Sequence, residues 1–228
     1  MKYEVLLFDA DETLFDFKKT ERYAFLNALI DFGLENNKER FIERYKIINK
    51  KIWEEFEKGL ITSDKLRVER FVRLFSEFGV NYDPKAFANS YIYHMGNSSY
   101  TFPEAESVIE DLSCKYKLAI VTNGLKEVQI NRLKKSNIGK YFDGVIISEE
   151  VNSAKPDKEI FTQALNKMSV RNKDKVLMIG DSLTADIKGG INSGIDTCWY
   201  NPHRAKNILG IEPTYEIYTL LALRDILL

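Results

Sequence analysis

Four short apolar runs, each rich in β-branched residues and followed at once by polar or glycine residues, most constrain the fold of this chain. They cover residues 3–8, 117–121, 144–147 and 175–179, and a weaker fifth run covers residues 196–200. Apolar residues in succession are typical of strands that are buried on both faces of a parallel sheet. Segments with helical spacing separate the last four runs. The sequence therefore predicts βαβ units: an α/β fold with a Rossmann-like parallel sheet and helices on both faces.

Residues 17–99 depart from this alternation. Four segments carry apolar residues at three- and four-residue spacing with charged residues between them: residues 22–32, 39–58, 63–78 and 84–95. This spacing predicts amphipathic helices. A glycine follows each segment, at the position where a left-handed residue commonly stops a helix: Gly33, Gly59, Gly79 and Gly96. We therefore expect a core of residues 1–16 and 100–228 and an inserted all-helical domain of residues 17–99.

Composition excludes several classes of function. Among 228 residues, 33 Lys and Arg nearly cancel 34 Asp and Glu, for a formal net charge of -1, which argues against a nucleic-acid partner. No run approaches the ~20 apolar residues that span a bilayer, and the amino terminus has no signal-peptide core. We expect a cytoplasmic protein without a membrane partner, either a monomer or a homodimer. The two cysteines lie far apart, and with only two histidines in the chain carboxylates are the expected acid and base.

Polar residues follow the predicted strands, at the edge where an open parallel sheet presents its ligand crevice. These residues are Asp9-Ala10-Asp11-Glu12-Thr13, Thr122-Asn123-Gly124, Lys155 before Pro156, and Gly180-Asp181-Ser182 with Asp186. Helix capping is an alternative explanation for Thr122, Asp157, Ser182 and Asp186. Capping does not explain why Asp9, Asp11 and Asp181 converge without a compensating cluster of arginines.

Such carboxylates would repel one another and raise each other's pKa values. Mg²⁺ resolves this conflict, because it binds one or two carboxylates together with water and phosphate oxygens. The sequence therefore predicts a Mg²⁺-dependent phosphoryl-transfer site. The basic segment of residues 132–135 is expected to form an exposed helix face.

Taken in order, these four groups of residues resemble the motifs of the haloacid dehalogenase (HAD) superfamily of phosphohydrolases, and the helical insertion resembles its C1 cap. Within the superfamily the chain is most similar to the pyrimidine 5'-nucleotidase subgroup. That likeness rests on the DADETLF form of the first motif and on residues 49–71, 147–151 and 197–199. The commonest first motif has glycine at the position of Glu12. We expect Glu12 either to be a solvated neighbour or to alter the field at Asp11.

The resemblance implies a role for each motif residue. Asp9 would attack phosphorus and form an aspartyl-phosphate, and Asp11 would act as general acid and then as general base. Thr122, Asn123 and Lys155 would hold the phosphoryl oxygens. Mg²⁺ would bind the carboxylates of Asp9 and Asp181 and the backbone carbonyl of Asp11, with Asp186 in an outer position.

The implied activity is a Mg²⁺-dependent 5'-nucleotidase for pyrimidine nucleoside monophosphates such as UMP, dUMP and dTMP. Its partner would be a small phosphate monoester. Two alternatives stay open: a phosphatase of a small sugar phosphate or phosphoglycolate-type substrate, and a non-catalytic scaffold that binds a phosphorylated ligand. Specificity is expected to reside in the cap. Most of its aromatic residues fit core packing, and Trp53 is the one we expect to contact substrate.

Overall fold

The computed structural model describes residues 2–228, which divide into two compact units. The first unit comprises residues 2–17 and 99–228, and the second comprises residues 18–98. Within the described chain, no helix combines the length and apolar character needed to cross a bilayer.

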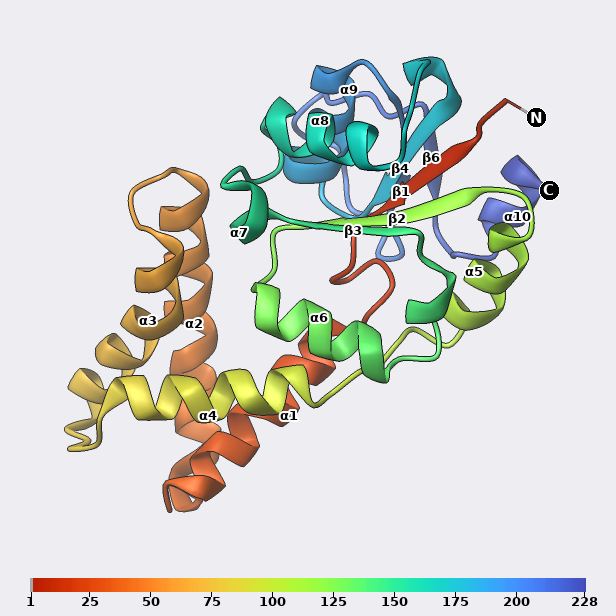
Figure 1. Ribbon diagram of the computed structural model, residues 1–228. Helices are drawn as coiled ribbons and strands as arrows, with labels where there is room; N and C mark the ends of the chain where they lie inside the picture. Colours follow the sequence, from red (N-terminus) through yellow and green to blue (C-terminus); the bar gives the residue numbers. More distant parts are fainter. Residues whose placement is uncertain (1) are drawn as a thin grey trace. The chain divides into compact units, whose positions relative to one another are not determined.

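Six parallel strands form the sheet of the first unit, in the order β3-β2-β1-β4-β5-β6 (Figure 1). They are β1 (Val5–Phe8), β2 (Lys117–Thr122), β3 (Gly144–Ile147), β4 (Val176–Gly180), β5 (Asp196–Tyr200) and β6 (Tyr215–Ile217). The predicted α/β fold with a parallel sheet is confirmed. The sequence prediction missed β6, because three residues at the sheet edge, with Glu216 exposed, carry no unbroken apolar run.

Helices cover both faces of this sheet, as Figure 1 shows. One face packs against α5 (Ala105–Ser113), α6 (Lys126–Lys135) and α10 (Ala222–Leu227), and the other packs against α8 (Lys158–Lys167) and α9 (Lys188–Ser193). Leu6 and Phe8 of β1 join the first apolar layer, and Leu7 joins the second. Side chains of a strand alternate between faces, so an unbroken apolar run is what a strand covered on both sides requires.

The strand order also fixes where the chain leaves room for a ligand. From β1 the chain continues to β2 and β3 on one side of the sheet and then crosses to β4 on the other. Loops that follow β1 and β4 diverge at this switch point, which is where open parallel sheets form their ligand crevice.

Four helices build the second unit: α1 (Phe17–Asp31), α2 (Lys38–Glu57), α3 (Ser63–Phe78) and α4 (Pro84–Gly96). Its core is aromatic, with the rings of Phe25 and Tyr45 stacked at 4.3 Å and those of Phe71 and Phe87 tilted at 5.0 Å between centroids. This packing accounts for the aromatic residues at helical spacing in the sequence.

Three of the four glycines predicted to stop helices adopt left-handed conformations, with φ of 64° at Gly33, 69° at Gly59 and 63° at Gly79. The prediction for Gly96 was wrong. Gly96 is the last residue of α4, and the helix ends instead at Asn97 in a right-handed conformation. The Asn97 N–H still donates to the carbonyl of Tyr93, so the helical bonding pattern continues past the glycine.

Candidate active site

Three carboxylates gather at the carboxyl edge of the sheet. One oxygen each from Asp9, Asp181 and Asp186 lies within 4.8 Å of the others. Asp9 follows β1 directly and Asp181 follows β4 directly. Because Phe8 and Ile179 are register partners, the two strands end at nearly the same level. The Asp9 N–H donates to the carbonyl of Ile179 at 2.9 Å, which fixes the first turn after β1 against β4.

Lys155 supplies the positive charge in this cluster. Its Nζ lies 2.5 Å from Asp9 Oδ1 and 2.7 Å from Asp186 Oδ1, and its side chain is 2 % exposed. Asn123 holds the backbone of this lysine from both sides: its Nδ2 donates to the Lys155 carbonyl at 2.9 Å, and its Oδ1 accepts the Lys155 N–H at 2.8 Å. The residue after β2 therefore positions the lysine that neutralises the carboxylate after β1.

Burial and mutual repulsion shift the ionisation of the cluster. Burial, with the charges of Asp186 and Asp181 added, raises the pKa of Asp9 well above its usual range despite Lys155. Burial and the charge of Asp186 raise the pKa of Asp181 to about 7. Burial lowers the pKa of Lys155, but Asp186 and Asp9 outweigh this effect and the pKa lies above its ordinary value. One lysine thus leaves the three carboxylates incompletely neutralised.

The donor set fits a hard divalent cation. All three groups present carboxylate oxygens, the ligands that Mg²⁺ prefers, and their formal charge exceeds that of Lys155 by two. Asp186 is the most committed of the three, because its Oδ1 faces Lys155 and its Oδ2 accepts the Ser182 N–H at 3.0 Å. These contacts suit Asp186 to an outer position. Gly180 permits them, since a Cβ at that residue would overlap the Asp186 carboxylate.

The backbone and side chain of Asp181 are anchored by neighbouring elements. Its carbonyl accepts the Trp199 indole N–H at 2.8 Å, and its Oδ1 accepts the Thr13 hydroxyl at 3.3 Å.

Thr122 ends β2 and is buried, and its Oγ1 accepts the Gly124 N–H at 3.0 Å. The hydroxyl that we predicted to hold phosphate thus also orders the turn that opens toward α6.

Asp11 lies near this cluster, since its charge helps to raise the pKa of Asp9, but it is not one of the three carboxylates that gather. The carboxylate of Asp11 points to α6, and Asp186 stands in its place in the three-carboxylate cluster. Arg132 Nη1 lies 2.5 Å from Asp11 Oδ1, and Gln129 Nε2 donates to Asp11 Oδ2 at 2.6 Å. An arginine therefore does balance Asp11, contrary to the expectation from the sequence.

The predicted exposed basic face of residues 132–135 is also wrong at its first residue. Arg132 is fully buried, whereas Lys134 is exposed. A signal was present in the sequence: Val128, Gln129, Arg132 and Leu133 form one stripe at helical spacing, and all four are buried. A charged residue inside the stripe that faces the core needs a partner of opposite charge, and the acidic first motif provides one.

Glu12 occupies a left-handed backbone position, with φ of 62°. Its N–H donates to the Phe15 carbonyl at 2.8 Å, closing the turn that follows Asp11. Glycine adopts this conformation without steric cost, which accounts for glycine at this position in the commonest first motif. The charge of Glu12 contributes to the raised pKa of Asp181.

Trp53 lies on α2 of the second unit and is half-buried. Its ring meets Phe56 edge-on at 5.8 Å between centroids, and the Arg70 guanidinium carbon lies 6.0 Å from its centroid. By contrast, four other aromatic residues of the second unit are buried in its core: Phe41, Tyr45, Phe71 and Phe75.

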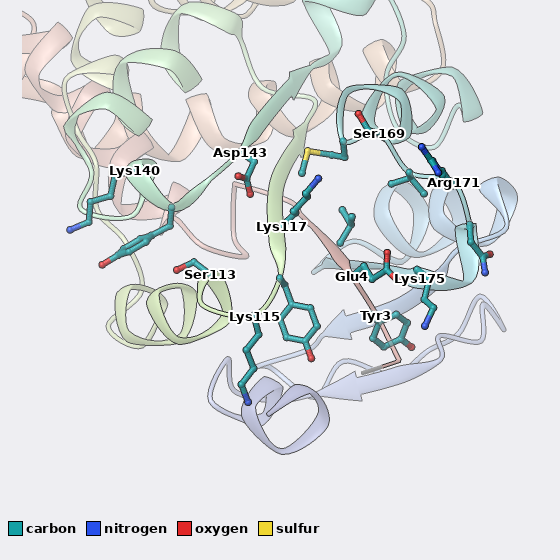
Figure 2. Close-up of a pocket in the computed structure, with 16 residues that line it drawn as sticks. Tyr3, Glu4, Ser113, Lys115, Lys117, Lys140, Asp143, Ser169, Arg171 and Lys175 are labelled. Atoms are coloured by element: carbon teal, nitrogen blue, oxygen red, sulfur yellow. The ribbon is translucent and has the colours of Figure 1, made fainter.

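A cavity of about 950 Å³ opens at the opposite end of the sheet, where the strands begin (Figure 2). Its wall carries both signs of charge, including Glu4, Lys117, Asp143 and Arg171. Asp143 is already committed, because its Oδ2 accepts the Leu118 N–H at 2.9 Å. The predicted chemical groups lie at the other edge, so we locate the candidate site by the carboxylate cluster and not by this cavity.

The chain is similar to known proteins over its whole length. Residues 6–200 match the family model described as haloacid dehalogenase-like hydrolase. The chain is 39% identical over 228 residues to the pyrimidine 5'-nucleotidase PynA of Streptococcus pneumoniae, covering 100% of this chain and 96% of that one. It is 36% identical over 229 residues to the pyrimidine 5'-nucleotidase YjjG of Escherichia coli, covering 100% and 99%. A crystal structure of the HAD-hydrolase YfnB from Bacillus subtilis, bound to magnesium, superposes with a TM-score of 0.91 at 36% identity, covering 100% and 99%.

Proposed function

The chain belongs to the haloacid dehalogenase-like hydrolase family, and on that premise we propose that it is a Mg²⁺-dependent 5'-nucleotidase for pyrimidine nucleoside monophosphates. The observation that carries the proposal is the buried cluster in which Lys155 faces Asp9 and Asp186, with Asp181 beside them. A buried carboxylate next to a fixed lysine and two further carboxylates suits attack on a charged phosphoryl group. The nucleotide substrate is supported by the names of PynA and YjjG, which this chain matches over its whole length.

Asp9 is proposed to act as the nucleophile. A carboxylate oxygen of Asp9 forms a bond to phosphorus while the bond from phosphorus to the nucleoside 5'-oxygen breaks, leaving an aspartyl-phosphate. Lys155 holds the Asp9 carboxylate in place before the attack. Thr122 and Lys155 then hold the equatorial phosphoryl oxygens, and the Asn123 side chain keeps the lysine backbone fixed.

Asp11 is proposed to move the proton in both halves of the reaction. It donates a proton to the departing 5'-oxygen, and it then accepts a proton from the water that attacks the aspartyl-phosphate, which restores Asp9. The carboxylates of Asp9 and Asp181 and the Asp11 backbone carbonyl would hold Mg²⁺, with Asp186 outside them. When bound, Mg²⁺ supplies charge neutralisation at the phosphoryl oxygens.

Phosphate release from UMP, dUMP and dTMP tests this proposal. We expect turnover that stops with EDTA, returns with MgCl₂ and falls by at least ~1,000-fold in Asp9→Asn, because the substituted amide is not a nucleophile. A panel of phosphate monoesters provides the comparison. Faster turnover of small sugar phosphates than of any nucleotide would replace the substrate assignment, and no turnover of any ester with Mg²⁺ still bound would favour the scaffold.

The second unit is proposed to act as a cap that selects the substrate, with Trp53 stacking on the base. The support is that Trp53, like its neighbour Phe56, is half-buried, whereas Phe41, Tyr45, Phe71 and Phe75 are buried. Loss of one base-stacking ring costs about 1–3 kcal/mol. In the same assay, Trp53→Ala is expected to raise KM for UMP about tenfold and to leave KM for ribose 5-phosphate, which has no aromatic ring, unchanged. Trp53→Phe is the matched control and should retain most of the affinity.

A further inference from the structure

Helix α6 grips the carboxylate of Asp11 with two side chains. Gln129 and Arg132 are three residues apart and so lie on one face of the helix. Arg132 Nη1 contacts Asp11 Oδ1 at 2.5 Å, and Gln129 Nε2 donates to Oδ2 at 2.6 Å. Each carboxylate oxygen therefore has its own donor. Rotation of this carboxylate would break at least one charge-assisted hydrogen bond, which is stronger than a neutral one.

The arginine is itself held rigidly. Its side chain is 0 % exposed, and its guanidinium carbon lies 4.4 Å from the centroid of the Phe15 ring. Phe15 is also fully buried, and its N–H donates to the Ala10 carbonyl at 2.9 Å. The aromatic platform under Arg132 thus belongs to the same turn that carries Asp11. A catalytic side chain needs this kind of support from residues whose own positions are fixed.

Arg132 does little else in the fold. Among the residues that the structure describes, Asp11 is its hydrogen-bond partner, and its Nε and Nη2 are buried with none. An arginine that tied elements together would use those N–H groups on backbone carbonyls, as buried polar groups usually do. Replacing a buried ion pair by apolar side chains of similar volume often leaves a protein no less stable. The buried guanidinium of Arg132 therefore serves one interaction, its ion pair with the Asp11 carboxylate.

The Asp11 carboxylate remains accessible to a substrate although Arg132 and Gln129 hold it. Its side chain is 24 % exposed, and each carboxylate oxygen keeps a second lone pair beyond the one used by α6. Gln129 Nε2 also lies 3.3 Å from Thr122 Oγ1, which links the grip to the predicted phosphate-binding hydroxyl.

We propose that Arg132, assisted by Gln129, is the positioning residue that aims the Asp11 carboxylate at the leaving oxygen and later at the attacking water. This inference rests on the acid and base role proposed for Asp11. In the first step Asp11 gives its proton to the nucleoside 5'-oxygen as the phosphorus–oxygen bond breaks. In the second step, a water oxygen forms a bond to phosphorus and gives its proton to Asp11 while the bond between phosphorus and the Asp9 oxygen breaks.

Substrates with different leaving groups distinguish the two steps experimentally. A nucleoside 5'-oxygen is a strong base and needs the proton, whereas p-nitrophenolate departs without one. If Arg132 acts through Asp11, its loss slows the first turnover of UMP much more than the first turnover of p-nitrophenyl phosphate. Hydrolysis of the aspartyl-phosphate also slows, so p-nitrophenolate appears in a burst followed by a slow phase.

The experiment compares single turnovers of the full chain with Mg²⁺ on both substrates. In Arg132→Met we expect uridine release to slow ~100-fold, the scale of general acid catalysis. The p-nitrophenolate burst should stay within about fivefold of the wild type, with KM nearly unchanged. Arg132→Lys keeps a donor and should recover part of the rate. Lys134→Met, an exposed position on the same helix, is the matched control and should behave as the wild type.

Equal slowing of both substrates in Arg132→Met, or slowing of neither, would overturn the positioning role. Should Arg132→Met not fold, Gln129→Met leaves the ion pair intact and is expected to slow uridine release selectively by about tenfold. Asp11→Asn tells the two proposals apart. If Asp11→Asn slows uridine release selectively but the Arg132 and Gln129 variants do not, only the positioning role is refuted. If Asp11→Asn slows both substrates equally, the acid and base role of Asp11 is refuted as well.

Discussion

At the scale of the residue, Glu12 combines a left-handed backbone with a negative charge beside Asp181. A left-handed conformation costs a residue with a Cβ roughly 1–2 kcal/mol, while glycine adopts it freely but loses more chain entropy on folding. We therefore expect Glu12→Gly to unfold with a free energy about 1 kcal/mol higher than Glu12→Ala.

Both substitutions remove the charge, so their difference isolates the backbone conformation. Urea denaturation of the two variants measures it. Glycine is normally the less stable of this pair, and alanine proving the more stable at position 12 would refute the left-handed turn.

Single residues also show what the sequence could predict. Asp9 and Thr122 directly follow apolar runs, and Asp181 follows one after a single glycine. The ends of parallel strands meet at one edge, so the proximity of these residues could be predicted from spacing alone. The partner of Asp11 could not, because its identity depends on which turn of α6 faces the loop after β1. That relation is set by packing between segments more than 100 residues apart.

At the scale of the element, helix α9 is held close to α8 by small residues. A Cβ on Gly189 would overlap the Phe161 ring and approach the Pro156 backbone. Overpacking of a buried contact typically costs 1–3 kcal/mol. We expect Gly189→Ala to lower the free energy of unfolding by ~2 kcal/mol, although alanine favours helices in general.

Asn192→Ala provides the comparison, because Asn192 is exposed on the same helix and alanine there should be neutral or slightly stabilising. Thermal denaturation of both variants measures the effect. A stabilised Gly189→Ala protein would contradict the close approach of the two helices.

Elements were predicted well where burial is complete. Strands β1 to β4 are covered by helices on both faces, so their sequences are apolar apart from the two ends of β2, exposed Lys117 and buried Thr122. Strand β6 lies at the edge with one exposed and one half-buried residue, and nothing in three such residues distinguishes a strand from a loop.

At the scale of the whole molecule, we expect the carboxylate cluster to couple stability to pH and to Mg²⁺. The pKa of Asp181 is raised to about 7 in the folded protein and is about 3.9 in an unfolded chain. The folded state therefore binds the proton more tightly, and the stability contributed by this group is present below about pH 4 and is lost as the pH rises through about 7. Without Mg²⁺, we expect wild type to become less stable than Asp181→Asn over this range.

Excess Mg²⁺ should reverse the order at about pH 8, since a cation that binds the ionised cluster stabilises only the folded wild type. The same addition should have little effect at about pH 5, where Asp181 is protonated. Melting temperatures of both proteins with EDTA and with MgCl₂ measure these shifts. Equal Mg²⁺ stabilisation of wild type and Asp181→Asn would remove Asp181 from the cation site.

The indole contact to Asp181 has an optical consequence. The chain has two tryptophans: Trp199 is buried in the first unit with its N–H on the Asp181 carbonyl, and Trp53 is half-buried in the second. Each unit thus carries one tryptophan, whose emission can be excited apart from that of the tyrosines. In a Trp53→Phe protein the emission comes from the environment of the carboxylate cluster alone, and in a Trp199→Phe protein it comes from the helical unit alone. Two single-tryptophan proteins can therefore follow, without any added label, what each half of the molecule does during turnover.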